Sequence, residues 1–288
     1  MAYISYQDAP LYFGNSANTS ALPTEGNNNG VIAQQVQLNY TPNIAPARVV
    51  GKEPTKDNFN LSGPPNASLS FSAYIAPGEF IPTNFTGDVG DTGTTFRIGD
   101  SLNGISGSGA FMTSFSYTVS PYAPILMQCD FAIYNPLTTT NIGGKIADAG
   151  NDAVLPATTF STFGHGAYSL FDGNGVNVST RLGDIDTFES IQYQFSANRL
   201  PVYTVGSYNL TKCELLTAEH SLQIQGDNIQ RLVPITGSNP GSIRIQVKNA
   251  SAATLLTSTV DGRLNAENVT IQGGDLARGS ITITELLK

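Results

Sequence analysis

The stretch Phe188–Gly206 reads FESIQYQFSANRLPVYTVG, and a related stretch, VQLNYTPNIAPARVVG, occupies Val36–Gly51. In each, an alternating apolar run ends on a Tyr, a polar segment containing Asn follows, and a Pro precedes a short β-branched run that ends on Gly. Phe115–Pro124, FSYTVSPYAP, repeats the first half. Alternation of period two is typical of a strand with one buried face, and Pro is typical of a sheet edge or bend. The repetition predicts a strand–turn–strand unit at each end of the chain, in two related domains arranged in tandem.

The composition indicates a predominantly β protein. Hydrophobic residues make up 40% of the 288 residues but charged residues only 12%, about half the share of an ordinary globular protein. Gly, Asn, Ser and Thr fill the difference, which enriches strand and turn formers over helix formers. A surface so poor in charge suits a protein largely covered by its neighbours, although secreted β proteins share this composition.

The net charge, the first ten residues and the lack of long apolar runs argue against several classes of protein. A formal net charge of −8 argues against a protein that grips nucleic acid by neutralising phosphates. The first residues, MAYISYQDAP, have neither a basic segment nor an apolar core, so we expect no signal peptide and synthesis in the cytoplasm. No apolar run approaches the roughly 18 residues of a membrane span, so no membrane partner is expected.

The patterning divides the chain into four parts. Residues 1–34 are rich in Asn, Ser and Gly and predict an extended N-terminal arm, whose aromatic side chains Tyr3, Tyr6, Tyr12 and Phe13 dock on another subunit; a loose terminus is the alternative. Residues 35–137 predict a first β-domain, 138–187 a linker or elaboration, and 188–288 a second β-domain. Each domain is expected to be a small sandwich or split barrel.

Short alternating runs predict the strands of both domains. The predicted strands are Val36–Tyr40, Ala47–Val50, Ala67–Ile75, Ala110–Val119, Ile125–Tyr134, Ile191–Phe195, Val202–Val205, Ser221–Gln225, Ser242–Val247, Val269–Gln272 and Ser280–Thr284. Thr211–His220, TKCELLTAEH, predicts one short helix with Leu215 and Leu216 facing inward. Ala76–Asp100 predicts a long polar loop, and loops of that length tend to be functional.

No motif of the chain predicts catalysis, a metal or a cofactor. Asp91-Thr92-Gly93-Thr94 spells an aspartic-protease signature, but no second copy exists to share the proton. Asp172-x-Asn174 opens like a calcium loop but places Val176 at the third ligand position and lacks the closing Glu. Gly104–Gly109, GISGSG, lacks the Lys of a phosphate loop. We therefore expect no enzyme activity, no catalytic or cofactor-binding residue and no metal ligand.

The few His and Cys residues point the same way. Only two His are present, His165 in a Gly-rich turn and His220 at the end of the predicted helix, and they cannot form a His-rich metal site. Cys129 and Cys213 lie in different halves of the chain. We interpret them as isolated structural thiols, because two cysteines so placed do not make a disulfide framework.

The arrangement resembles the tail-tube family of bacteriophages, including tube-like baseplate hub proteins. The resemblance rests on Gln37–Gly51 and Asn60–Ile75 in the first half and on Ile191–Gln225 in the second. It is one of architecture and covers about two-thirds of the chain; the long first arm and residues 138–187 depart from it. It implies β-domains flanked by a helix that close into six-domain rings, built from three two-domain chains or from a hexamer, and rings that stack into a hollow tube.

The resemblance implies a structural role in a virion tail, assembled in the host cytoplasm. The expected partners are other copies of the chain and stacked rings, with sheath or baseplate proteins as further candidates, while DNA passes through the lumen without specific binding. Asp88, Asp91 and Asp100 are candidate acids lining that lumen, since negative charge repels phosphate. The alternatives are a capsid-decorating or receptor-binding β protein and, from another class, a protease or glycan hydrolase.

Overall fold

The computed structural model describes residues 11–14, 30–31, 33–46, 59–61, 63–75, 93–98, 104–120, 125–140, 176–180, 190–205, 207, 209–226, 241–248, 254–270 and 278–287. Of these residues, 84% lie in strands and none lies in a helix. The expectation of a mainly β fold is therefore confirmed. Fourteen of the strands belong to one sheet, and β4 and β5 form a separate two-stranded sheet.

The strands are β1 (Leu11–Gly14), β2 (Gly30–Val31), β3 (Ala33–Thr41), β4 (Ile44–Pro46), β5 (Phe59–Leu61), β6 (Asn66–Tyr74), β7 (Thr94–Ile98), β8 (Gly104–Val119), β9 (Leu126–Ile133), β10 (Thr138–Thr140), β11 (Val176–Thr180), β12 (Ser190–Tyr203), β13 (Leu210–Gly226), β14 (Gly241–Lys248), β15 (Thr254–Thr270) and β16 (Arg278–Leu286).

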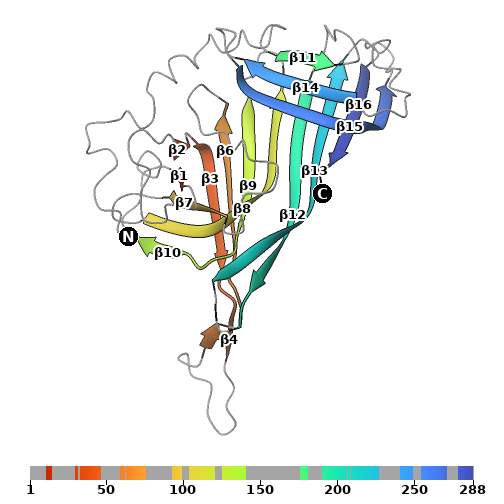
Figure 1. Cartoon of the computed structure of the whole chain (residues 1–288). Helices are drawn as coiled ribbons and strands as arrows, with labels where there is room; N and C mark the ends of the chain where they lie inside the picture. Colours follow the sequence, from red (N-terminus) through yellow and green to blue (C-terminus); the bar gives the residue numbers. More distant parts are fainter. Residues whose placement is uncertain are drawn as a thin grey trace, which may run out of the picture.

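Six neighbouring strands form the central part of the large sheet, in the order β3, β6, β9, β8, β12 and β13. Every junction between them is antiparallel. Figure 1 shows β3, β6, β9, β8 and β12 rising side by side, with β14 and β15 lying across the upper end. Because side chains alternate between the two faces of a strand, this sheet has one apolar face and one polar face.

Two groups of strands contribute side chains to the core on the apolar face. From β1, Phe13 packs against Phe71 and Phe131, with ring centroids 5.6 and 4.9 Å apart. From β15, Leu256 and Val260 are buried in the same hydrophobic cluster. One continuous core therefore joins both groups to the central sheet.

The two parts of β8 pair with different strands, and the strand changes partners at Gly109. Its first part, from Gly104, pairs with β7 and β10, and its second part, from Ala110, pairs with β9. Gly109, at the junction, has a positive φ of 64°. A Cβ on Gly107 would lie 2.4 Å from a ring carbon of Phe96, so only glycine fits there.

The predicted helix over Thr211–His220 is wrong, because these residues lie inside β13. The adjacent Leu215 and Leu216 resemble a helical apolar face. Pairing with β12 along the segment overrides that local preference. Ala218 lies opposite Ala197 of β12, and His220 lies opposite Phe195. Residues Ala218, His220, Leu222 and Ile224 then alternate inward with period two.

The turn predicted inside Phe188–Gly206 is also wrong. β12 continues through Asn198 and Pro201 to Tyr203, and a register shift between Asn198 and Arg199 marks a β-bulge. The Asn and Pro that predict a turn are therefore accommodated within one strand that contains a β-bulge. In the first copy, by contrast, a break at Pro42 and Asn43 separates β3 from β4.

Several other expectations need correction. Phe13 of the predicted arm lies in the core of its own chain and not on another subunit. Thr94–Ile98, within the predicted polar loop Ala76–Asp100, forms β7. Within residues 138–187, predicted as a linker or elaboration, β10 and β11 pair with strands of the large sheet, which agrees with the second of these alternatives and needs no correction. Tyr3, Tyr6, the predicted strand Ala47–Val50 and most of that loop and linker lie outside the described residues.

The two predicted domains, 35–137 and 188–288, contribute strands to the same sheet. Their junction is the pairing of β8 with β12, in which Phe115 lies opposite Phe195 and Tyr117 opposite Tyr193. The division into two tandem domains stays a prediction.

We expect Phe13→Ala to destabilise the isolated chain by about 3 kcal/mol, because the substitution leaves a cavity between two aromatic rings. Urea unfolding followed by fluorescence measures this change. Gln194→Ala, on the polar face, is the matched control and should change stability by less than about 0.5 kcal/mol. Equal stability of Phe13→Ala and the unmodified chain would mean that the first strand is not part of the monomer core.

Candidate functional site

The six central strands have one face covered by polar side chains, which we call the polar face throughout. Aligned positions form rows that cross the sheet. One row contains Gln37, Ser70, Asp130, Ser114, Ser196 and Glu219, and the next contains Gln35, Ser72, Gln128, Ser116, Gln194 and Ser221. Short hydroxyl and amide side chains therefore cover this face, and all are exposed or half-buried.

The polar face carries almost no charge. Within β3, β6, β9, the second part of β8, and the segments 190–198 and 219–226, the sequence contains no Lys and no Arg. Its acids are Asp130 and Glu219. The Ser114 hydroxyl donates a hydrogen bond to the Asp130 carboxylate. Over these segments the surface is well hydrated but offers no positive charge to a phosphate. Lower on β13, Lys212 is exposed and forms an ion pair with Glu214.

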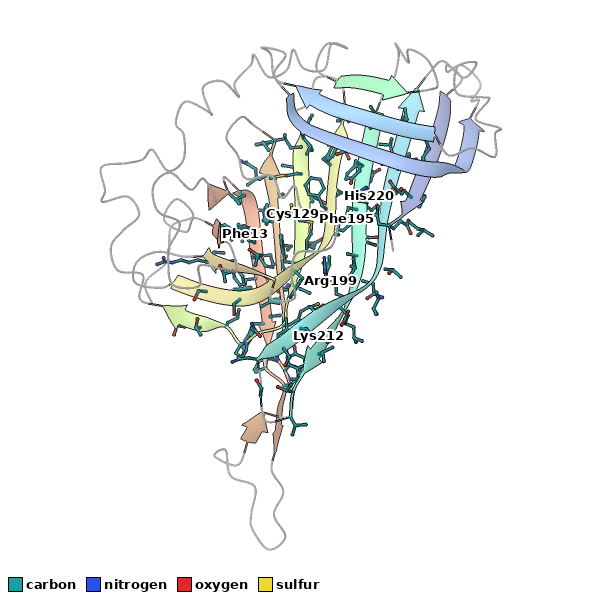
Figure 2. The ribbon with its side chains drawn as sticks, viewed as in Figure 1. Phe13, Cys129, Phe195, Arg199, Lys212 and His220 are labelled. Atoms are coloured by element: carbon teal, nitrogen blue, oxygen red, sulfur yellow. The ribbon has the colours of Figure 1, made fainter. Side chains whose placement is uncertain are left out.

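The opposite face holds buried polar groups in an aromatic cluster. The Tyr117 hydroxyl donates to Ser258 Oγ of β15 at 2.9 Å, which links the central sheet to the strand that covers it. Tyr193 stacks on Tyr117, with ring centroids 5.2 Å apart. Its hydroxyl lies 3.1 Å from His220 Nδ1, within hydrogen-bond distance. Figure 2 shows His220 and Phe195 in the upper part of the sheet.

Burial determines the protonation of this cluster. It raises the pKa of Tyr117 well above the ordinary value, and the hydrogen bond that Tyr117 makes with Ser258 offsets this only in part. Burial likewise raises the pKa of Tyr193, with smaller contributions from Tyr117 and Glu285. Both phenols therefore stay neutral and serve as hydrogen-bonding parts of the core, not as acids or bases.

Arg199 anchors the projecting end of the β12–β13 hairpin. At the β-bulge its side chain turns inward, where Nε donates to the Met112 carbonyl at 3.0 Å and the guanidinium carbon lies 5.3 Å from the Phe111 ring centroid. The Tyr203 hydroxyl donates to the Tyr134 carbonyl at 2.9 Å. These contacts hold the hairpin against β8 and the end of β9 (Figure 2).

The two cysteines are buried free thiols, as the sequence predicts. Burial raises the pKa of the Cys129 thiol, and the neighbouring Asp130 raises it further. Burial also raises the pKa of Cys213, although Arg199 lowers it in part. Because the thiolate is the reactive form, neither side chain has the environment of a nucleophile.

Few of the candidate motifs of the sequence lie within the described residues. Asp88, Asp91, Asp100, His165 and the Asp172-x-Asn174 segment lie outside the described residues. Gly104–Gly109 forms the first part of β8, which is a strand and not a phosphate-binding loop. His220 does not end a helix but lies buried in β13 beside Tyr193 and Phe195.

The described residues hold no metal-binding cluster and no membrane-spanning helix. No group of three or more His, Cys, Asp or Glu that could hold a metal ion occurs there. No helix in this part of the chain is long and apolar enough to cross a membrane. The sequence matches no protein-family model and no curated protein.

We expect neither cysteine to react with a thiol reagent such as dithionitrobenzoate in the folded protein at pH 8. Both pKa values are raised, so the thiolate fraction at this pH lies below that of an unperturbed thiol, and burial blocks access as well. Both should react in denaturant, as absorbance at 412 nm would record. Rapid reaction of one thiol in the native state would contradict the packing around it.

We expect Ser258→Ala to destabilise the chain by about 1–3 kcal/mol, because it leaves the buried Tyr117 hydroxyl without its acceptor. Tyr117→Phe removes the other partner. The double variant should lose less stability than the sum of the two single variants, because neither polar group then remains alone. Strict additivity in urea unfolding would show that the two hydroxyls are not coupled.

Proposed function

We propose that this chain is a structural protein of a virion, a tail-tube component that assembles into rings that stack around a DNA-conducting channel. The observation that supports the proposal is the polar face. A channel wall that DNA slides along must be wettable yet must not bind phosphates. Hydroxyls and amides meet the first condition, and the absence of Lys and Arg from the six strand segments meets the second.

The charge of the chain agrees with this role. The formal net charge is −8, so the electrostatic field of the protein repels a polyanion. On the polar face itself, Asp130 and Glu219 add negative charge without creating a cluster. DNA would therefore be confined by such a wall and would still move along it.

The shape of the chain adds a second line of support. The β4–β5 hairpin lies beyond the end of the central sheet in Figure 1, separate from the large sheet. At its base, Asn43 Nδ2 donates to the Pro64 carbonyl, which ties the segment before β4 to the segment after β5. An element that extends past the body of a subunit can contact a ring above or below it.

We expect the purified chain to form rings or tubes in negative-stain electron micrographs. Among the described residues, β3 pairs with a strand on one side only, and association with another copy would satisfy its second edge. Discrete particles of fixed small size would favour the alternative of a capsid-decorating or receptor-binding protein. A chain that stays monomeric at all concentrations would contradict the proposal.

A separate experiment tests whether the polar face lines the channel. In the triple variant Gln128→Lys, Ser116→Lys and Gln194→Lys, three neighbouring strands gain a positive charge in one row. Tubes of this variant should retain short double-stranded DNA in low salt and release it in high salt, whereas unmodified tubes should not retain it. Equal retention by both would place the polar face elsewhere in the assembly.

A further inference from the structure

Two edges of the central sheet have no strand beside them among the described residues. β3, at one end, pairs with β6 on one side only. At the other end, β16 pairs with β13 only from Glu219 to Gly226, and its last contact is the Leu287 amide donating to the Ala218 carbonyl at 2.8 Å. The segment Thr211–Thr217, which we call the lower β13 edge, therefore pairs with β12 alone.

The two edges carry only some of the features that usually prevent strands from pairing. β3 is nine residues long and contains no charged residue and no Pro, and its one register shift lies near its start, between Ala33 and Gln35. On the lower β13 edge the pairing with β12 shifts register at Thr211 and Leu216, and Lys212 and Glu214 form an ion pair with each other that leaves no net charge. Two such edges invite pairing with another chain.

Exposed apolar side chains gather at these same two edges. Five large hydrophobic side chains of the described residues are exposed. Tyr40 is on β3, Leu200, Val205 and Leu216 are on the hairpin of β12 and β13, and Leu286 lies opposite Glu219, just above the lower β13 edge. A contact that covers only one edge would leave the apolar side chains of the other in water.

The direction of the strands makes the two edges complementary. From β3 to β13 the sheet has five junctions, β3/β6, β6/β9, β9/β8, β8/β12 and β12/β13, and each is antiparallel. After five reversals β13 runs opposite to β3. If a second copy is rotated about an axis alongside the strands, its β3 lies antiparallel to the β13 of the first copy, and the polar face continues from one copy to the next.

We propose that β3 of one copy pairs with the lower β13 edge of the next. This head-to-tail contact satisfies both edges at once and repeats around a closed ring, whereas pairing of β3 with β3 would end at a dimer. The proposal deepens the tail-tube function and rests on it. It identifies the strands that join neighbouring subunits.

Charge pairs at two exposed positions test the contact. Asn39 and Thr217 are exposed on the two edges. The double variant Asn39→Lys, Thr217→Lys places like charges on both sides of the contact and should raise the concentration for half-assembly about tenfold or more. The variant Asn39→Lys, Thr217→Glu should restore assembly, and Gln192→Lys, in the middle of the polar face, is the matched control. Analytical ultracentrifugation gives the concentration, and thermal unfolding verifies that each variant folds. Thr41→Lys replaces Asn39→Lys if the latter does not fold.

The outcomes separate the contact from the function. If the chain assembles and the opposite-charge variant alone recovers assembly, the contact stands, even if micrographs show no tubes and the tail-tube function is wrong. If tubes form and no edge variant affects them, the function stands and the contact is wrong. Loss of assembly with Asn39→Lys that Thr217→Glu does not restore would indicate β3–β3 pairing and overturn the proposal, as would a chain that is monomeric without any substitution.

Discussion

The structure depends on the two-residue period of six adjacent strands, which places most of the large apolar side chains of the central sheet on one face. The register is strict, because a slip of one residue would exchange the buried Phe115, Tyr193 and Phe195 for Ser and Gln neighbours. The other features follow from this separation. The apolar face must be covered. Phe13 of β1, Phe96 of β7, and Leu256 and Val260 of β15 are buried in the same core. The polar face is left available for the outside of the molecule.

The separation of the faces also limits what the protein can do chemically. Four buried polar side chains of the described residues, Tyr117, Ser258, Tyr193 and His220, contact one another on the covered side of the sheet. The exposed side carries hydroxyls and amides whose chemistry is to bind water. This surface is the observation on which the proposed channel role rests.

Much of the fold could be predicted from alternation alone. The runs around Phe71, Phe115, Phe131 and Ile191 lie in strands, as expected, because burial of one face leaves a clear period of two in the sequence. The Ser and Gln residues that define the polar face occupy the alternate positions of those runs. The sequence alone therefore predicts that one face of these strands is polar. What alternation cannot reveal is which strands are neighbours, and hence which polar rows align.

The failures have local causes. The adjacent apolar residues Leu215 and Leu216 resemble part of a helical face, whereas in the structure Leu216 is the extra residue of β13 at the register shift opposite Asn198 and Arg199. Gly104–Gly109 has too few side chains to show any period. Phe13 belongs to a polar segment whose partners, Phe71 and Phe131, are more than 50 positions away in the chain (71 minus 13 is 58).

The pairing of β8 with β12 has a consequence for how the protein is made. Phe115 and Phe195 are opposite one another although 80 positions separate them (195 minus 115), so the centre of the sheet cannot close until the second half of the chain has been synthesised. Sheets built from such distant pairs form slowly, on a scale of milliseconds to seconds. During that interval the nascent first half exposes the edge of β8 that β12 will later occupy. A ribosome-bound chain therefore needs either rapid completion or a chaperone to keep that edge from capturing a strand of another nascent chain.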